Sequence, residues 1–308
     1  MGRIWGPNEQ QRSRQPDRVC APLDTRSHRT KLTTRGTSGP TCAVRRAPGP
    51  DGVTLGPVNL ILLQPEELDR DGVAVLCGRR AAHLTDVLGA REGEHLRVGT
   101  VRGPTGEATV TAIRRDVVEL SVRLAGDAPA EPALDLILAL PRPKVLSRTL
   151  QTAAAWGVRT IDLVNTWRVQ KSYFNSARLA PDALHRDLVL GCEQGAVTWV
   201  PDVSVHRLLM PYLQQVLAPR LEHEPAIHRL IAHPRTGRFV EAVVSPPAQR
   251  RAVVALGPEG GFVSREIESF EALGFVPVTI GSAVLRVEAA LSAVLAQVTL
   301  LLRSTGSR

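Results

Sequence analysis

The chain has 308 residues, 43% of them apolar, which is enough for two domains with buried cores. Its formal net charge of +8 suggests a nucleic-acid partner, but most of this charge lies in residues 1–57, where ten Arg and Lys outnumber four acids. The other residues carry 28 basic and 26 acidic side chains, so bulk charge does not predict that the folded part binds RNA. Any basic binding surface there must be local.

Residues 1–57 lack hydrophobic periodicity and are rich in Arg, Ser, Thr, Pro and Gly, so we expect them to be disordered. They contain no apolar segment of the kind found in secretory signal peptides. Three interpretations remain open. The segment is a mis-assigned gene start with the protein proper beginning at Val58, an RNA-binding tail, or an organelle-targeting leader.

The sequence gives no sign of a metal site or a membrane span. Its four Cys and eight His form no CxxC pair and no HExxH motif, so no metal is expected. The most apolar run, Ala289–Leu302, has fourteen residues and contains a glutamine, which is too short to cross a bilayer and predicts a buried helix. We therefore expect a cytoplasmic enzyme or RNA-associated protein without a membrane partner.

The sequence pattern of residues 58–127 predicts a small β-barrel. Short β-rich runs are separated by turn signals, and one helical segment, Arg79–Gly89, interrupts them. The expected strands are Val58–Leu63, Val73–Leu76, Glu94–Val101, Gly106–Ile113 and Val117–Leu124. The Pro- and Ala-rich stretch Gly126–Ala133 reads as a linker.

Strands and helices alternate over residues 133–308, which predicts an α/β domain with a mostly parallel sheet. The expected strands are Ala133–Pro141, Thr160–Trp167, His228–Pro234, Arg251–Leu256 and Val276–Ile280. The expected helices are Pro143–Gly157, Ser176–Glu193, Arg207–Leu217, Ser264–Leu273 and Ala289–Leu302.

The segment ALGPEGGFVSREI, Ala255–Ile267, places a glycine turn between a strand and a helix. It is neither a P-loop nor a GxGxxG fingerprint, yet it puts unhindered backbone N–H groups at the carboxyl end of a strand, where α/β sheets bind ligands. Ser264 can cap the following helix, with Glu266 and Glu268 near its positive end. A helix that supplies its own negative charge favours a neutral or cationic ligand over phosphate. An ordinary tight turn is the alternative.

A second strand-glycine-helix segment, Thr279–Ala290, places Arg286 and Glu288 at the start of a very apolar helix. Charged residues are rarely found there without a partner, so they either line a site or form a helix-end ion pair. Two glycine loops at consecutive strand ends favour one shared pocket.

Taken together, LGPEGGF and the later LRVEAA segment resemble the RsmE-type 16S rRNA uracil-N3 methyltransferases of the SPOUT superfamily. The similarity extends along residues 58–302 and includes HLTDVLGAREGEHLRV and GCEQG. The resemblance implies a PUA-like β-barrel followed by an α/β domain with a deep trefoil knot, a rare exception to unknotted chain connections. It also implies a homodimer that uses S-adenosylmethionine to methylate N3 of a uridine in the decoding region of the small ribosomal subunit.

The resemblance assigns residues as well. Those implied to bind S-adenosylmethionine are His233, Pro234, Leu256, Gly257, Pro258, Gly260, Gly261, Ile280, Gly281, Ser282, Val284, Leu285 and Arg286. Our mechanistic hypothesis is that Arg286 stabilises the developing uracil anion, that Glu288 orients Arg286, and that Glu259 accepts the proton, favours the sulfonium or only holds the turn. Local bases expected to contact RNA are Arg79, Arg80, Arg142, Lys144, Arg148, Arg168 and Lys171.

The chain departs from the family pattern at four places. Gly89 replaces an arginine, Thr152–Val158 reads TAAAWGV, Glu193–Val197 reads EQGAV, and Ala289 replaces a threonine. Two alternatives follow. One is a related SPOUT methyltransferase with another RNA target, and the other is a non-catalytic RNA-binding or ribosome-assembly protein that retains the fold.

Overall fold

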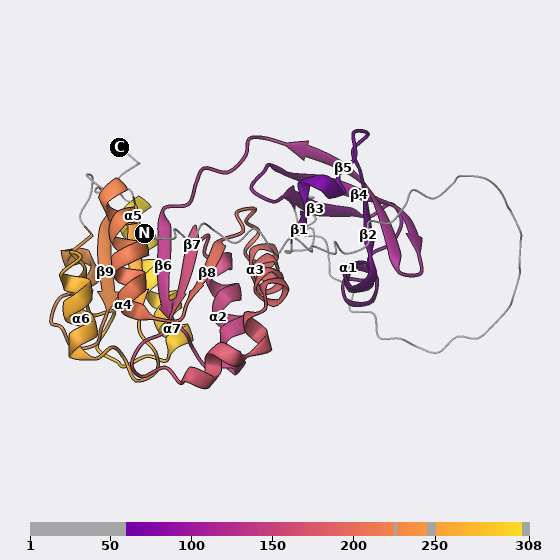
Figure 1. Ribbon diagram of the computed structural model, residues 1–308. Coiled ribbons are helices and arrows are strands. Elements are labelled where there is room, and N and C mark those ends of the chain that lie inside the picture. The colour runs from indigo at the N-terminus through magenta and orange to yellow at the C-terminus, as the bar shows by residue number, and fades with distance from the viewer. Residues whose placement is uncertain (1–59, 225–226, 245–250, 304–308) are drawn as a thin grey trace, which may run out of the picture. The chain divides into compact units, whose positions relative to one another are not determined.

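The computed structural model describes residues 60–224, 227–244 and 251–303 (Figure 1). The expectation for residues 1–57 lies outside this part of the chain. Within it, no helix is both long and apolar enough to cross a membrane. The same residues include no group of three or more His, Cys, Asp or Glu side chains that could hold a metal ion.

The first part of the described chain forms a five-stranded sheet in the order β1-β3-β4-β5-β2. Pairing is parallel between β1 and β3 and antiparallel between β2 and β5. Buried and partly buried residues alternate along β2, as a sheet with one covered face requires. All five strands match the predicted ones: β1 (Ile61–Leu63), β2 (Val73–Cys77), β3 (His95–Thr100), β4 (Thr105–Arg114) and β5 (Val117–Ala125).

The predicted helical segment of this region is also present, as α1 (Gly78–Ala82) continued by a π-helical turn at His83–Val87. It ends before Gly89, whose φ of 67° lies in the left-handed region. Glycine adopts that conformation without the steric cost that a side chain adds. This backbone requirement is a physical reason for glycine at a position where the family pattern has arginine.

The chain separates into two compact units. One contains Glu66–Glu94 and Thr109–Ser121, and the other contains the described parts of 56–65, 95–108 and 122–308. The predicted domain limits, 58–127 and 133–308, remain a prediction.

The second unit is built on a six-stranded sheet in the order β11-β9-β10-β6-β7-β8. Every neighbouring pair in this sheet is parallel, which confirms the predicted parallel α/β architecture. The strands are β6 (Leu134–Ala139), β7 (Thr160–Val164), β8 (Asp202–His206), β9 (His228–Ala232), β10 (Ala252–Leu256) and β11 (Val276–Val278).

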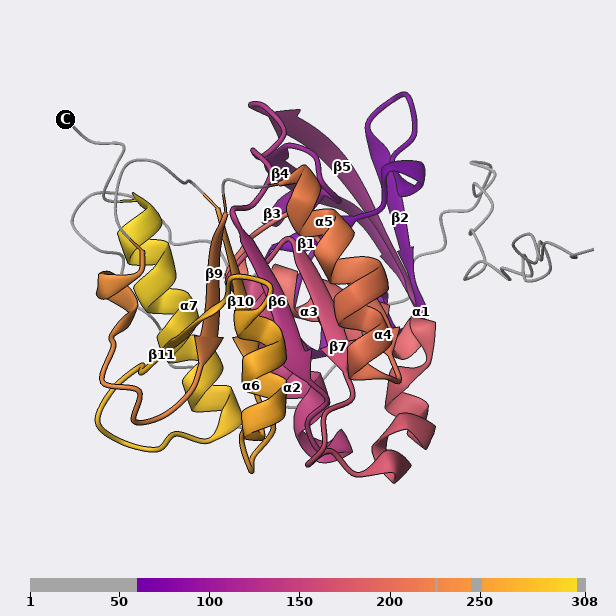
Figure 2. The same cartoon turned by 60° about the vertical axis from the view of Figure 1, so that its left-hand side comes forward.

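Helices cover both faces of this sheet (Figure 2). Leu136 and Leu138 of β6 point into a core shared with α2 (Pro143–Ala155), α3 (Pro181–Gly195) and α7 (Val287–Arg303). Ile137 points the other way, into a core with α4 (Leu209–Tyr212), the π-helical turn Leu213–Leu217, α5 (Ala218–His223) and α6 (Ser264–Glu271). Burial on both faces explains why β10 is a continuous apolar run and why β6 is apolar at every position except Asp135.

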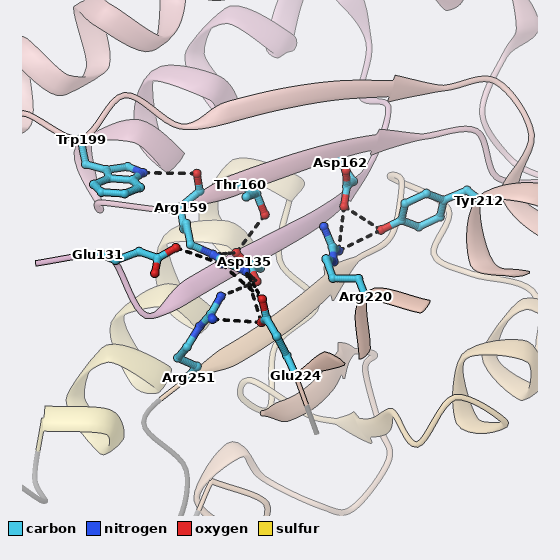
Figure 3. A network of polar contacts seen from close by, with 10 residues as sticks. All are labelled: Glu131, Asp135, Arg159, Thr160, Asp162, Trp199, Tyr212, Arg220, Glu224 and Arg251. Atoms are coloured by element: carbon cyan, nitrogen blue, oxygen red, sulfur yellow. Dashed lines mark hydrogen bonds and ion pairs between the residues drawn. The ribbon is translucent and has the colours of Figure 1, made fainter. Parts of the chain in front are cut away.

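An ionic network lies at the amino ends of the strands (Figure 3). Asp135 is only 2% exposed and accepts from Arg159 Nε at 2.7 Å and from Thr160 Oγ1 at 2.9 Å. Arg251 and Glu224 extend the network through a 3.0 Å ion pair. A buried carboxylate is tolerated only when it is paired and hydrogen-bonded, so this cluster is structural.

One strand was missed, and two local expectations were wrong. Strand β8 was not predicted, because its exposed edge gives it mostly polar, exposed residues without a buried stripe. The predicted helix from Ser176 begins as an α-helix only at Pro181, after a 3₁₀ turn at Ala177–Leu179. Ser264 is not the N-cap of α6, because Val263 occupies that position and Ser264 is the first helical residue.

Candidate functional site at the carboxyl edge of the parallel sheet

The candidate site consists of three loops that follow β9, β10 and β11. The three strands are parallel, and β9 lies between the other two, so their carboxyl ends meet at one edge of the sheet. Open α/β sheets bind ligands at this edge. The loops are 233–239, 257–263 and 279–286, and they contain nearly all the residues expected to bind the cofactor.

The loops after β9 and β11 are hydrogen-bonded to each other. The His233 N–H donates to Val278 O at 2.9 Å, and the Thr279 N–H donates to Arg238 O at 2.7 Å. The Thr236 N–H donates to Thr279 Oγ1 at 2.9 Å. From α7, Gln297 Nε2 donates to Ile280 O at 2.8 Å. The structure thus brings the predicted residues of both loops to one place.

The loop after β10 makes a tight turn. The Gly261 N–H donates to Pro258 O at 2.8 Å, and Gly261 has a φ of 73° that favours glycine. Leu256, Gly257 and Pro258 are buried, whereas Glu259 and Gly260 are exposed at the tip. The predicted cofactor turn therefore presents its second half to solvent.

Two arginines that are predicted to contact RNA also contact this turn. Arg142 Nε lies 3.5 Å from Glu259 Oε1, and the Arg168 guanidinium donates to Gly260 O. A Cβ at Gly260 would lie 2.9 Å from Arg168 Cδ, so glycine leaves room for the arginine stem. Both side chains are exposed, which leaves guanidinium N–H groups facing solvent.

Glu266 is the residue of the site whose role sequence reasoning missed. Glu266 is 8% exposed, and its carboxylate accepts from the Trp167 N–H at 2.7 Å and from the Val263 N–H at 2.9 Å. It therefore joins the loop after β7 to the loop after β10. The signal in the sequence was a glutamate at the third helical position, which we interpreted only as a favourable interaction with the helix dipole.

Arg286 and Glu288 lie where α7 begins. Arg286 is exposed, and its carbonyl accepts the Ala290 N–H at 2.8 Å, so it occupies the start of the helix. Among the described residues, neither side chain forms an ion pair within 4.0 Å, so the structure does not join Glu288 to Arg286 or to Glu259. Ser282, Val284 and Leu285 are exposed beside Arg286.

The other residues predicted to contact RNA differ in exposure and in whether an acidic side chain already pairs with them. Lys144, Arg148 and Lys171 are exposed in the same unit as the loops. In the other unit Arg79 is exposed, but Arg80 donates to both carboxylate oxygens of Glu67, at 2.6 and 2.8 Å. The charge of Arg80 is thus already compensated.

The donor set of the three loops fits a small polar ligand without a metal. His233 Nδ1 is buried and has no hydrogen-bond partner within the described chain, and such a group usually has one. A Cβ at Gly281 would meet nothing within 4 Å, so the loop after β11 has open space beside its backbone. Backbone groups and a histidine nitrogen can hold the amino acid and adenosine parts of a cofactor.

Fold and site together define the class: a parallel α/β domain with ligand loops at its carboxyl edge and basic side chains beside them. Residues 129–299, more than half of the chain, match the RNA methyltransferase domain family. The chain therefore belongs to the RNA methyltransferase family.

The alignments with curated relatives span most of this chain and most of each relative. The chain is 28% identical over 246 residues to ribosomal RNA small subunit methyltransferase E of Treponema pallidum, covering 78% of this chain and 90% of the relative. It is 22% identical over 233 residues to ribosomal RNA small subunit methyltransferase E 1 of Borreliella burgdorferi, covering 76% and 94%.

Solved structures share the fold. A ribosomal RNA small subunit methyltransferase E from Neisseria gonorrhoeae, bound to S-adenosyl methionine, superposes with a TM-score of 0.64 at 23% identity, covering 79% of this chain and 97% of that one. A methyltransferase from Legionella pneumophila in complex with the same cofactor gives 0.63 at 22% identity, covering 81% and 98%.

Proposed function

We propose that this protein is an S-adenosylmethionine-dependent methyltransferase of 16S rRNA that acts in the cytoplasm on N3 of a uridine. The observation that carries the proposal is that the loops after β9, β10 and β11 lie at one edge of the sheet. The His233–Val278 and Thr279–Arg238 hydrogen bonds join the loops after β9 and β11. The curated relatives are named as small-subunit rRNA methyltransferases, and two structures of the same fold hold the cofactor. The decoding-region target comes from the sequence resemblance.

The finer architecture is part of the proposal. We propose that the carboxyl-edge loops form a trefoil knot, that the curled five-stranded sheet is a PUA-like domain for RNA, and that a homodimer completes the site. The strand order β11-β9-β10-β6 supports the proposal of a knot, because β10 is inserted between β6 and β9 after both of these strands have formed in chain order. Val284 and Leu285, 69% and 39% exposed, are apolar side chains that a second subunit or the ligand would cover.

When bound, S-adenosylmethionine supplies a methyl group on a cationic sulfonium. The chain must hold the reacting atoms in line and stabilise the uracil, whose N3 loses a proton. We propose that Arg286 donates to uracil O4 or O2, where negative charge develops. Its exposed guanidinium, without an ion-pair partner among the described residues, supports that role.

The two glutamates have different surroundings. Glu259 is held by Arg142, which favours fixing the turn over accepting the proton. Glu288 stands two residues after Arg286 in the first turn of α7, and we propose that it orients Arg286 once the substrate is bound.

Calorimetric titration with S-adenosylmethionine tests the cofactor assignment. A methyltransferase of this kind binds the cofactor, and His233→Ala weakens that binding. A chain that binds small-subunit rRNA but not the cofactor would instead be the RNA-binding or assembly protein that retains the fold.

A further inference from the structure

Trp167 is far more exposed than is usual for so large an apolar side chain. Its side chain is 83% exposed, whereas Trp156 is 39% exposed and Trp199 packs under the Arg102 guanidinium, 4.7 Å from its ring. A tryptophan is a large apolar surface that folding normally covers, and where one stays exposed it often marks a binding site.

The backbone that carries Trp167 is fixed. Trp167 and Arg168 are the two central residues of a turn closed by a 3.0 Å hydrogen bond from the Val169 N–H to Thr166 O. Thr166 and Val169 are 4% and 7% exposed, so both ends of the turn are anchored in the protein. The buried Glu266 carboxylate accepts the Trp167 N–H at 2.7 Å. A fixed backbone displays the indole without a large loss of entropy on binding.

The turn is directly beside the candidate site. The guanidinium of Arg168 donates to Gly260 O, in the glycine turn after β10. The Glu266 carboxylate accepts hydrogen bonds from the backbone N–H groups of Trp167 and of Val263, the last residue of the loop that contains that turn. Trp167 is therefore tied, by its own backbone and by its neighbour, to the loop expected to hold the methyl donor.

Two acids lie near Trp167, the buried Glu266 and Glu259, which is paired with Arg142, and the two chain segments around Trp167 are otherwise basic. Residues 140–150 and 165–181 contain no acid, and Arg178 Nη1 donates to Ser147 Oγ at 2.9 Å, so the two segments are packed together. Their six basic residues are Arg142, Lys144, Arg148, Arg168, Lys171 and Arg178. A second copy of this chain meeting itself here about a twofold axis would oppose like charges.

We infer that Trp167 is a stacking platform for an unpaired nucleobase of the RNA substrate. The inference rests on the proposed function, since it names a contact to the same RNA. Proteins that hold single-stranded RNA combine aromatic faces for the bases with cations for the phosphates. The exposed indole and the Arg and Lys side chains of the two packed segments supply both kinds of contact. Stacking of this kind tolerates any base and adds affinity without chemistry.

The test measures RNA affinity and cofactor affinity separately, on the full chain. The probe is 16S rRNA transcribed in vitro, titrated in a filter-binding assay. Trp167→Ala is expected to raise the Kd for RNA by about 5- to 150-fold, the range measured when a stacking aromatic residue is removed. Trp167→Phe keeps a ring and is expected to stay within about fivefold of the parent. Calorimetry with S-adenosylmethionine should give the same Kd for all variants.

Trp156→Ala is the matched control. Trp156 follows α2 at the amino edge of the sheet, away from the loops after β7 and β10, and its loss should leave the Kd for RNA unchanged. Sedimentation velocity gives the association state of each variant. An unchanged Kd for RNA in Trp167→Ala would overturn the inference. A weaker RNA affinity that is accompanied by a change in association state would also overturn it. If the parent protein binds cofactor but no RNA, the proposed function fails and this inference fails with it. If the parent protein binds RNA and only Trp167→Ala loses RNA affinity, the result supports both the proposed function and the inference about Trp167.

Discussion

Arg142 Nε and Glu259 Oε1 lie 3.5 Å apart and form an ion pair between the N-cap of α2 and the glycine turn after β10. The side chains of Arg142 and Glu259 are 66% and 39% exposed, so solvent screens their attraction. The contact therefore positions the turn more than it stabilises the fold. It also places the glutamate expected to do chemistry against an arginine expected to bind RNA.

This pair gives the first prediction. Glu259→Gln and Arg142→Ala should each change the free energy of unfolding by no more than about 1 kcal/mol. Each should weaken cofactor binding by a few-fold, and the double variant should be no weaker than the worse single variant. Calorimetry on the four proteins measures this cycle. Independent, additive losses would show that the pair does not act through the turn, and a turnover loss in Glu259→Gln as large as that in Arg286→Ala would make Glu259 the proton acceptor.

Glu266 should matter far more for stability than its exposed neighbour. Glu266→Ala leaves the Trp167 and Val263 N–H groups without their buried acceptor, so we expect unfolding to become easier by about 2–5 kcal/mol. Glu268→Ala, two residues further along α6 and exposed, should stay within about 0.5 kcal/mol. Urea denaturation of both variants checks this. Equal effects would mean that Glu266 does not join the two loops.

Arg286→Ala should lower methyl transfer by about 100- to 1,000-fold while the protein stays folded, the usual effect of removing one donor to a developing anion. Single-turnover rates with cofactor and rRNA in excess measure the chemical step. Arg265→Ala, another exposed arginine, serves as the control and should leave the rate unchanged. A near-normal rate for Arg286→Ala would remove this residue from the site.

Asp162 in β7 predicts a dependence of stability on pH. Burial raises its pKa, but the His206 hydrogen bond, the charge of Arg220 and the hydrogen bond from Tyr212 outweigh burial, and the net pKa is below its usual value. Figure 3 shows the contacts of Asp162 with Arg220 and Tyr212. A carboxylate with a lowered native pKa stabilises the fold above its unfolded pKa of about 4, and this contribution is lost as pH falls through the native pKa.

Asp162→Asn should therefore be less stable than the parent at pH 7, by about 1–3 kcal/mol, and this difference should shrink below about pH 4. Urea unfolding of both proteins at pH 7 and pH 3 gives the comparison. A difference that is constant across this range would contradict the account of the Asp162 cluster.

The sequence predicted most of the parallel sheet because burial on both faces makes most residues of β6, β7, β9 and β10 apolar. It did not predict β8, since an edge strand buries little. Only two of its five residues, Val203 and Val205, are apolar, and none of the five is buried. The loops that form the site were predicted from glycine turns at strand ends. Their mutual contacts were not, because His233 and Val278 meet only through the strand order of the sheet.

The roles of individual polar residues were harder to predict. Arg142 and Arg168 were identified as basic residues near the site, but a count of charges cannot show that each one contacts the glycine turn. Glu266 looked like an ordinary helix-start glutamate, and its importance depends on a backbone N–H that is 99 residues distant. Such partners are set by tertiary packing and leave no local signal in the sequence.

The central claim is methylation of uracil N3 in 16S rRNA, and nucleoside mass spectrometry of small-subunit rRNA tests it most directly. The comparison is between the parent strain, a deletion strain, and deletion strains carrying the parent gene or Arg286→Ala. We expect 3-methyluridine to disappear on deletion, to return with the parent gene and to stay absent with Arg286→Ala. Unchanged 3-methyluridine in the small-subunit rRNA of the deletion strain would contradict the assignment.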